Sequence, residues 1–258
     1  MDRRPVLCHA PSFHFFWTTI LLLGLAPLAY GFDEQITHPQ LTRAAIAQSK
    51  LEATLKSALG ISNGPAETLP SFQGAPLNRL QALPISEWLT AGSSDEDDPV
   101  CSAINHFHNP LKPFTQSGNS DVAGVVGKLW CWGTSPYQQV YSNVTWGTGY
   151  TDVTTHATNA QKTGNTADWD AARLAYYEAQ RQENRDARNA YLAQTFYILG
   201  HLLHLVQDLG VPAHARDDFL SHFYHLDINL NQPVTKWVGN GFELFVKNHG
   251  TIISGLPT

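Results

Sequence analysis

Charged side chains are scarce in this chain, and no cluster of basic residues is present. Lysine, arginine, aspartate and glutamate make up 15% of the 258 residues, and the formal net charge is −6. Binding to duplex DNA usually requires lysine and arginine concentrated on one surface, so the composition argues against this class of function. A metal-dependent nuclease is not excluded, because bound ions would supply positive charge at its site.

The chain also lacks an apolar run long enough for an ordinary membrane-spanning helix. Its longest apolar stretch, at 15–25, follows Arg3 and Arg4 and precedes the small residues of Ala29-Tyr30-Gly31. This order is typical of a secretory signal peptide, although a retained anchor helix is the alternative. We expect residues 1–31 to be removed, which would make the protein secreted or periplasmic.

Cysteine is rare as well, with three residues in the chain. Cys8 would be lost with the signal peptide, which would leave Cys101 and Cys131. An even pair in an oxidising compartment makes a disulfide between them plausible, with two free thiols as the alternative.

Hydrophobic residues are plentiful by contrast, at 43% of the chain. This fraction and the length suffice for one sizeable core, so we expect residues 32–258 to form a single domain. Amphipathic periodicity predicts an all-α fold, a compact multi-helix domain with long loops and an irregular excursion at about 114–165. The helices are expected at 43–60, 77–90, 166–190, 191–209 and 234–249.

Polar residues interrupt the apolar helix expected at 191–209 at a regular spacing. His204 and Asp208 are four residues apart and therefore lie one turn apart on the same helix face, with His201 on the same stripe. Pro212 ends the helix region, and the turn would direct His214 back past the helix end. Three histidines and one aspartate would thus lie close together.

Such a group is typical of a metal site, although most single histidines bind no metal. A buried Asp208 without a partner would cost several kcal/mol through desolvation, and a divalent cation would remove this cost. Zinc takes neutral imidazole and carboxylate ligands, usually four of them. The total of twelve histidines also fits a metal-binding protein. The residues alone therefore predict a zinc site on a helix.

The spacing His204-x3-Asp208-x5-His214, with Pro212 before the last histidine, resembles the central signature of the bacterial zinc-dependent phospholipase C family. The zinc-dependent single-strand nucleases are relatives of this family. The resemblance implies the multi-helix fold of that family and two or three zinc ions, with Asp208 bridging two of them. It covers the ligand-bearing segments of the chain.

Further ligands follow from the resemblance. His38 matches a histidine near the mature N-terminus, where Phe32 would bind zinc through its amine and carbonyl groups if Gly31 is the last residue removed. Asn105-His106-Phe107-His108-Asn109-Pro110 resembles a short element of the family whose histidine, here His106, is a ligand. Asp97 matches a ligating aspartate that is also discussed as a general base, and Asp95, Glu96 and Asp98 are alternatives.

The third zinc of the family is less well matched. Glu243 corresponds to its acidic ligand, but Gly239 stands where a histidine is expected. His222 or His225 could take its place, and we choose His225; otherwise this zinc is lost or weakly held.

The resemblance implies a monomeric zinc-dependent phosphodiester hydrolase. We expect a phospholipase C-like enzyme that acts on phospholipid head groups and contacts membranes peripherally. A single-strand nuclease is one alternative, and a non-catalytic secreted zinc-binding domain is another. A further hypothesis is that the chain is the N-terminal part of a longer protein, because its last residues show no closing element.

Overall fold

The chain has an all-α fold, as predicted, with two small antiparallel sheets of two strands each in the part described. The computed structural model describes residues 35–113, 116–118, 140–150, 162–218, 225–227, 236–238, 241–250 and 253. The expected signal peptide, Phe32, Cys131 and most of the irregular excursion lie outside the described residues. None of the helices in the described ranges has the length and apolar content needed to span a membrane.

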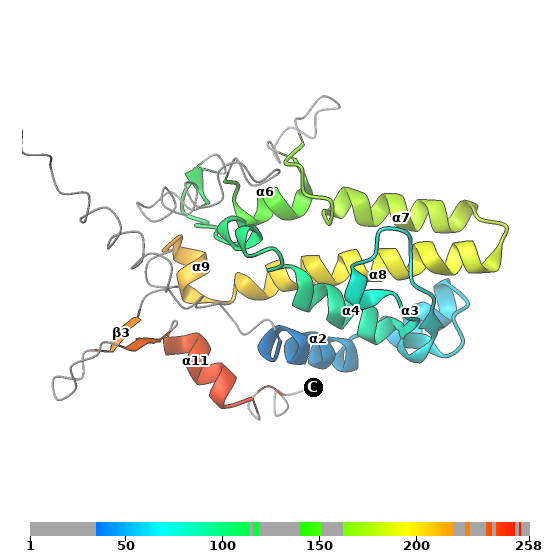
Figure 1. Cartoon of the computed structure of the whole chain (residues 1–258), viewed down its shortest axis with the longest axis horizontal. Coiled ribbons are helices and arrows are strands. Elements are labelled where there is room, and N and C mark those ends of the chain that lie inside the picture. Colours follow the sequence, from blue (N-terminus) through cyan, green and yellow to red (C-terminus); the bar gives the residue numbers. More distant parts are fainter. Residues whose placement is uncertain are drawn as a thin grey trace, which may run out of the picture.

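The longest helix, α8 (Arg185–Asp208), runs through the middle of the molecule (Figure 1). Helices α7 (Trp169–Arg181) and α4 (Ile85–Asp95) both pack along it. The break between α7 and α8 lies earlier than the expected boundary between residues 190 and 191. Asn184 produces it, because its side chain accepts hydrogen bonds from the backbone N–H groups of Asp186 and Ala187 and so caps α8.

Two glycines allow α4 and α8 to approach each other closely. A Cβ atom on Gly92 would lie 1.9 Å from the carbonyl oxygen of Tyr197, and one on Gly200 would lie 2.2 Å from that of Leu89. Any side chain at these positions would force the two backbones apart. The absence of side chains here brings α4 directly against the turn of α8 that precedes His204.

Helices α2 (Thr37–Gln48) and α3 (Leu51–Ala58) replace the single helix expected at 43–60. Helix α2 begins earlier than expected and therefore includes His38 in its first turn. The break follows from Ser49, whose hydroxyl donates to the carbonyl oxygen of Ile46 and accepts from the backbone N–H of Leu51. Such local bonds compete with those of a continuous helix.

Proline accounts for the second difference from the expected helices. The helix expected at 77–90 starts only at Ile85, because Pro84 opens the first turn of α4.

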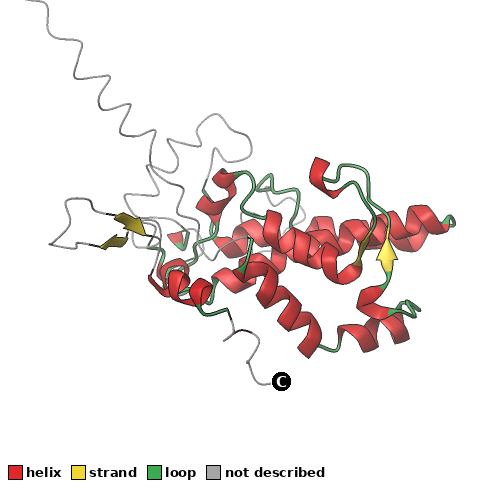
Figure 2. Cartoon of the chain, turned by 60° about the horizontal axis from the view of Figure 1, so that its bottom comes forward, coloured by secondary structure: helices red, strands yellow, loops and turns green. Residues whose placement is uncertain are grey.

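The helix expected at 234–249 is wrong in its first part, where strand β4 (Lys236–Val238) pairs with β3 (His225–Asp227). Helix α11 (Gly241–Asn248) forms the remainder. Figure 2 shows that helices make up most of the described chain.

Short elements connect the main helices. They are η1 (Gly64–Ala66), β1 (Thr68–Leu69), η2 (Leu77–Arg79), β2 (Leu83–Pro84), η3 (Val100–Asn105), α6 (Asn143–Thr148) and α9 (Pro212–Arg216).

The main hydrophobic core joins α3, α4 and α8 around buried Leu55, Trp88 and Phe196. A second cluster packs Ile104 and Trp146 against Leu205 of α8. Cys101, which belongs to this cluster, is disulfide-bonded.

Candidate metal centre

His204 and Asp208, one turn apart on α8, form the middle of a buried polar cluster. The Nδ1 atom of His204 donates a hydrogen bond to the carbonyl oxygen of Ser93 on α4, at 2.7 Å. This bond fixes the ring so that Nε2 faces the carboxylate of Asp208, 3.3 Å from Oδ2. Both side chains are almost fully buried. The close approach of α4 and α8 thus sets the orientation of the first imidazole.

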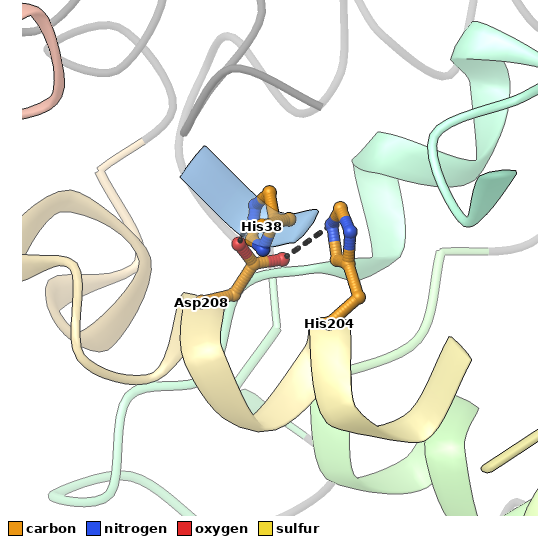
Figure 3. A group of neighbouring side chains, drawn as sticks. All are labelled: His38, His204 and Asp208. Atoms are coloured by element: carbon orange, nitrogen blue, oxygen red, sulfur yellow. Dashed lines mark ion pairs between the residues drawn. The ribbon is translucent and has the colours of Figure 1, made fainter. Parts of the chain in front are cut away.

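The ring of His38 reaches the same carboxylate from the first turn of α2. Its Nδ1 lies 2.7 Å from Oε1 of Gln207, to which it donates, and its Nε2 lies 3.4 Å from Oδ1 of Asp208. The ring stacks on that of His204, with the centroids 3.7 Å apart. Figure 3 shows the two imidazoles and the carboxylate pointing toward one another.

Asp97 and His106 come from the segment that follows α4. The Nδ1 atom of His106 lies 2.9 Å from Oδ2 of Asp208 and 3.3 Å from Oδ1 of Asp97. The other oxygen of Asp97 lies 3.6 Å from Nε2 of His204. The short helix η3 lies between the two residues and returns the chain to the cluster.

His214 completes the group from α9, after the turn at Pro212. Its Nδ1 donates to the carbonyl oxygen of His106 at 3.0 Å, and its Nε2 lies 3.9 Å from Oδ1 of Asp208. The ring stacks against Phe107, with the centroids 4.5 Å apart. The structure therefore brings six of the predicted ligands into one place: His38, Asp97, His106, His204, Asp208 and His214.

Two overlapping groups of buried donors in this cluster could each hold a metal ion. One consists of His38, His204 and Asp208, and the other of Asp97, His106 and His204; within each group the donor atoms lie within 4.8 Å of one another. Four ligands placed tetrahedrally at zinc distances are roughly 3.3–3.6 Å apart. Several of the nitrogen–oxygen distances between the imidazoles and carboxylates of the cluster fall in this range. His204 belongs to both groups, so the two candidate positions adjoin.

Electrostatics of the cluster also favours a cation. Burial raises the pKa of Asp208, but the neighbouring His214 and His204 lower it further, so that the net pKa lies well below the ordinary value. Burial lowers the pKa of His204, whereas the carboxylates of Asp208 and Asp97 raise it to about 9. The pKa of His38 is lowered by burial and by His204. The ionised carboxylate of Asp208 is therefore stabilised by nearby positive charge, which a divalent cation would also supply.

The structure distinguishes between the four acidic residues considered at 95–98. Asp97 alone of the four belongs to one of the two donor groups found among the described residues. Asp95 accepts hydrogen bonds from Arg79 and Tyr197, and Glu96 accepts from Trp146 and pairs with His201. Asp98 is exposed.

Three of the predicted ligands are not placed in the cluster by the structure. Phe32 lies outside the described residues. The backbone of His225 is in β3 and that of Glu243 is in α11, but their side chains are outside the described part. The third zinc position therefore stays a prediction.

Several residues that support the cluster were not found from the sequence. Gln207 accepts from His38 and donates to Thr42, which in turn donates to the hydroxyl of Ser93, so that α2, α4 and α8 are linked by one polar network. Asn143 on α6 donates to the carbonyl oxygens of His106 and Leu205. Amides and hydroxyls of this kind carry no recognisable spacing, since their partners lie far away in the chain.

Comparisons of the chain with protein-family models, with curated proteins and with solved structures found no match. The interpretation of the site thus depends on the geometry of the chain's own side chains. The resemblance to the zinc-dependent phospholipase C family stays a prediction from the sequence.

Proposed function

We propose that the protein is a secreted zinc-dependent phosphodiester hydrolase of the phospholipase C type. The observation that carries this proposal is the common orientation of the imidazoles. His38, His204 and His214 each donate from Nδ1 to a fixed oxygen and turn Nε2 toward Asp208. Histidines that bind metals are typically held in this way, because the bond at one ring nitrogen directs the lone pair of the other.

Zinc is the cation that this donor set favours. Neutral imidazole nitrogens and carboxylate oxygens are its usual ligands, whereas calcium and magnesium prefer oxygen alone. The two overlapping groups would supply the donors: His204 would bind one ion through Nε2, because its Nδ1 is held by Ser93, and Asp208 has two oxygens that two ions would share. A third would require His214, His225 and Glu243, as the resemblance implies.

Bound zinc would generate hydroxide from water near neutral pH and stabilise negative charge on a phosphoryl group. Asp97 is the carboxylate that we propose as general base, because it lies at the edge of the cluster with 7% of its surface exposed. Asp208, at 1% exposure, faces imidazoles with both oxygens and is better suited to bridging. The reaction would yield a phosphomonoester and an alcohol.

The preferred substrate is a phospholipid head group. The low content of lysine and arginine and the net charge of −6 give little attraction for a polyanion such as single-stranded DNA. A lipid diester carries one phosphate and requires less positive charge on the protein surface.

The test is to purify the secreted protein, count its zinc by elemental analysis and measure hydrolysis with and without a chelator. A chromogenic phosphodiester, phosphatidylcholine vesicles and single-stranded DNA are the three substrates. We expect two or three zinc ions per chain and chelator-sensitive cleavage of the first two substrates. Preferential cleavage of DNA would identify a nuclease, and bound zinc without any turnover would identify a zinc-binding domain.

A further inference from the structure

Glu96 lies directly before Asp97 but belongs to neither donor group, and its side chain is 3% exposed. Its Oε1 accepts a hydrogen bond from Nε1 of Trp146 at 2.9 Å, and Oε2 lies 2.5 Å from Nδ1 of His201. A buried carboxylate costs several kcal/mol unless such partners compensate for the loss of water. A hydrophobic residue would avoid this cost, so the position of the carboxylate calls for a functional reason.

Ser102 also donates to Oε1 at 3.4 Å, but the functional reason lies at another neighbour of the carboxylate, the ring of His106. Nε2 of His106 lies 3.5 Å from Oε1 of Glu96, while Nδ1 faces the carboxylates of Asp208 and Asp97. The two nitrogens of this ring therefore face opposite sides, one the cluster and the other Glu96. The rings of His204 and His214 have the opposite orientation. Their Nδ1 atoms donate to carbonyl oxygens, and their Nε2 atoms face the cluster.

We propose that Glu96 is a positioning residue that holds the Nε2–H of His106 and so makes His106 bind the metal through Nδ1. This inference rests on the proposed metal centre and adds a residue that touches neither metal nor substrate. A carboxylate behind a ligating imidazole fixes its tautomer, fixes its ring orientation and increases its basicity. The carbonyl and amide oxygens behind the other rings of the cluster are weaker acceptors.

His201 and Trp146 hold Glu96 in the orientation that this role requires. They bind its two different oxygens from α8 and α6, so the carboxylate cannot rotate without losing one of these bonds. The ring of His201 also packs edge-on against Tyr197, with the centroids 4.7 Å apart. This explains why His201 lies on the stripe of His204 and Asp208 and yet belongs to neither donor group.

The substitution Glu96→Gln tests the proposal, with Asp95→Asn as its matched control. Both remove one negative charge from adjacent buried or half-buried positions, but Asp95 binds Arg79 and Tyr197 rather than an imidazole of the cluster. The measurements are the dissociation constants of zinc and cobalt by competition with a chelator, and the visible spectrum of the cobalt form. Circular dichroism establishes that each variant is folded.

Glu96→Gln should weaken metal binding by roughly 10–100-fold and alter the cobalt spectrum. Asp95→Asn should leave both unchanged, whatever its effect on thermal stability. A folded Glu96→Gln variant with wild-type affinity and spectrum would overturn the proposal. A wild-type protein that binds no divalent cation would overturn both this inference and the proposed function, so the two failures are distinguishable.

A second measurement needs no variant and covers the case in which Glu96→Gln does not fold. Long-range proton–nitrogen correlation spectra of the zinc-loaded wild type show which nitrogen of each histidine ring carries a proton. The proposal requires a protonated Nε2 and a metal-bound Nδ1 for His106, and the opposite arrangement for His204. Zinc bound to Nε2 of His106 would contradict it.

Discussion

Asp208 is the residue on which the imidazoles of the candidate metal centre converge. Its Oδ1 faces His38 and His214, and its Oδ2 faces His106 and His204. No other carboxylate in the described ranges meets so many histidines. The identity of this one side chain therefore decides whether two cations can be held next to each other.

Asp208→Asn should release metal and abolish phosphodiester hydrolysis, because an amide offers a single neutral acceptor in place of two charged oxygens. Zinc content after dialysis and turnover of a chromogenic substrate measure the two effects. Asp217→Asn is a suitable control, since it removes the charge of another buried carboxylate, which pairs with Lys112. Full activity of Asp208→Asn would show that Asp208 is not a bridging ligand.

Metal binding by the cluster should release protons. The pKa of His204 is about 9, so before binding this ring carries a proton at pH 7.5 that the metal must displace. Because the raised pKa values of His204 and His106 both favour the protonated rings, apparent zinc affinity should increase with pH from neutrality to about 9. Calorimetry in buffers of different ionisation enthalpy gives the number of protons released. Zero release at pH 7.5 would contradict the expected protonation of His204.

The sequence was informative about residues whose spacing is local. His204 and Asp208 lie one turn apart on α8, so helical periodicity was enough to bring them together, and His214 follows on α9 directly after the turn. His38, Asp97 and His106 were identified by resemblance, and their convergence could not be derived from spacing because it depends on how α2 and α4 pack. Gln207 and Asn143 gave no signal for the site, and Glu96 was considered only as an alternative ligand to Asp97.

At the scale of elements, the contact between α4 and α8 controls the geometry of the cluster. It places the Ser93 carbonyl against His204, and it depends on Gly92 and Gly200. The sequence predicted the helical part of both elements but not this close crossing. A glycine within a helix can simply be tolerated, and only the packed structure shows what a side chain there would meet.

Gly200→Ala should destabilise the protein by about 1–3 kcal/mol, because the added methyl group forces the two helix backbones apart. Metal affinity should also fall, since Ser93 would move away from His204. Urea unfolding and chelator competition measure these effects. In the control Gly147→Ala, the new methyl group meets the flexible end of Leu205 at 3.1 Å, and little loss is expected. Equal stability of both variants would refute the role assigned to the crossing.

Two of the errors in the predicted elements have local causes, and a third has a tertiary cause. Ser49 divides the first expected helix with its hydroxyl, and Pro84 delays the start of α4. The strand at Lys236–Val238 was missed because its pairing with β3 is a tertiary contact that amphipathic periodicity does not reveal. Helices α7 and α8 occur in the predicted order, whereas the short helices α6 and α9 were not predicted.

At the scale of the whole molecule, the cluster joins α2, α4, α8 and α9 through buried polar groups. A cation bound there would interact with four elements of the fold at once, whereas the unfolded chain would hold these donors apart. Binding that is confined to the folded state stabilises that state in proportion to the logarithm of the ligand concentration.

Saturating zinc should therefore raise Tm by roughly 5–10 °C over the chelated protein, which corresponds to about 2.7 kcal/mol at a hundredfold excess over Kd. Differential scanning calorimetry with a chelator, and again after zinc is restored, gives the shift. The Tm of Asp208→Asn should not respond to zinc. A wild-type Tm that is the same in both conditions would count against a metal centre within the fold.

His204 belongs to both groups of donors, and it lies late in the chain, near the end of α8. Ribosomes synthesise the N-terminal part first, so a nascent chain that exposes His38, Asp97 and His106 still has neither group complete. Ion capture must then wait until α8 has been made and has docked against α4. Acquisition of the metal would thus be among the last steps in the maturation of the protein.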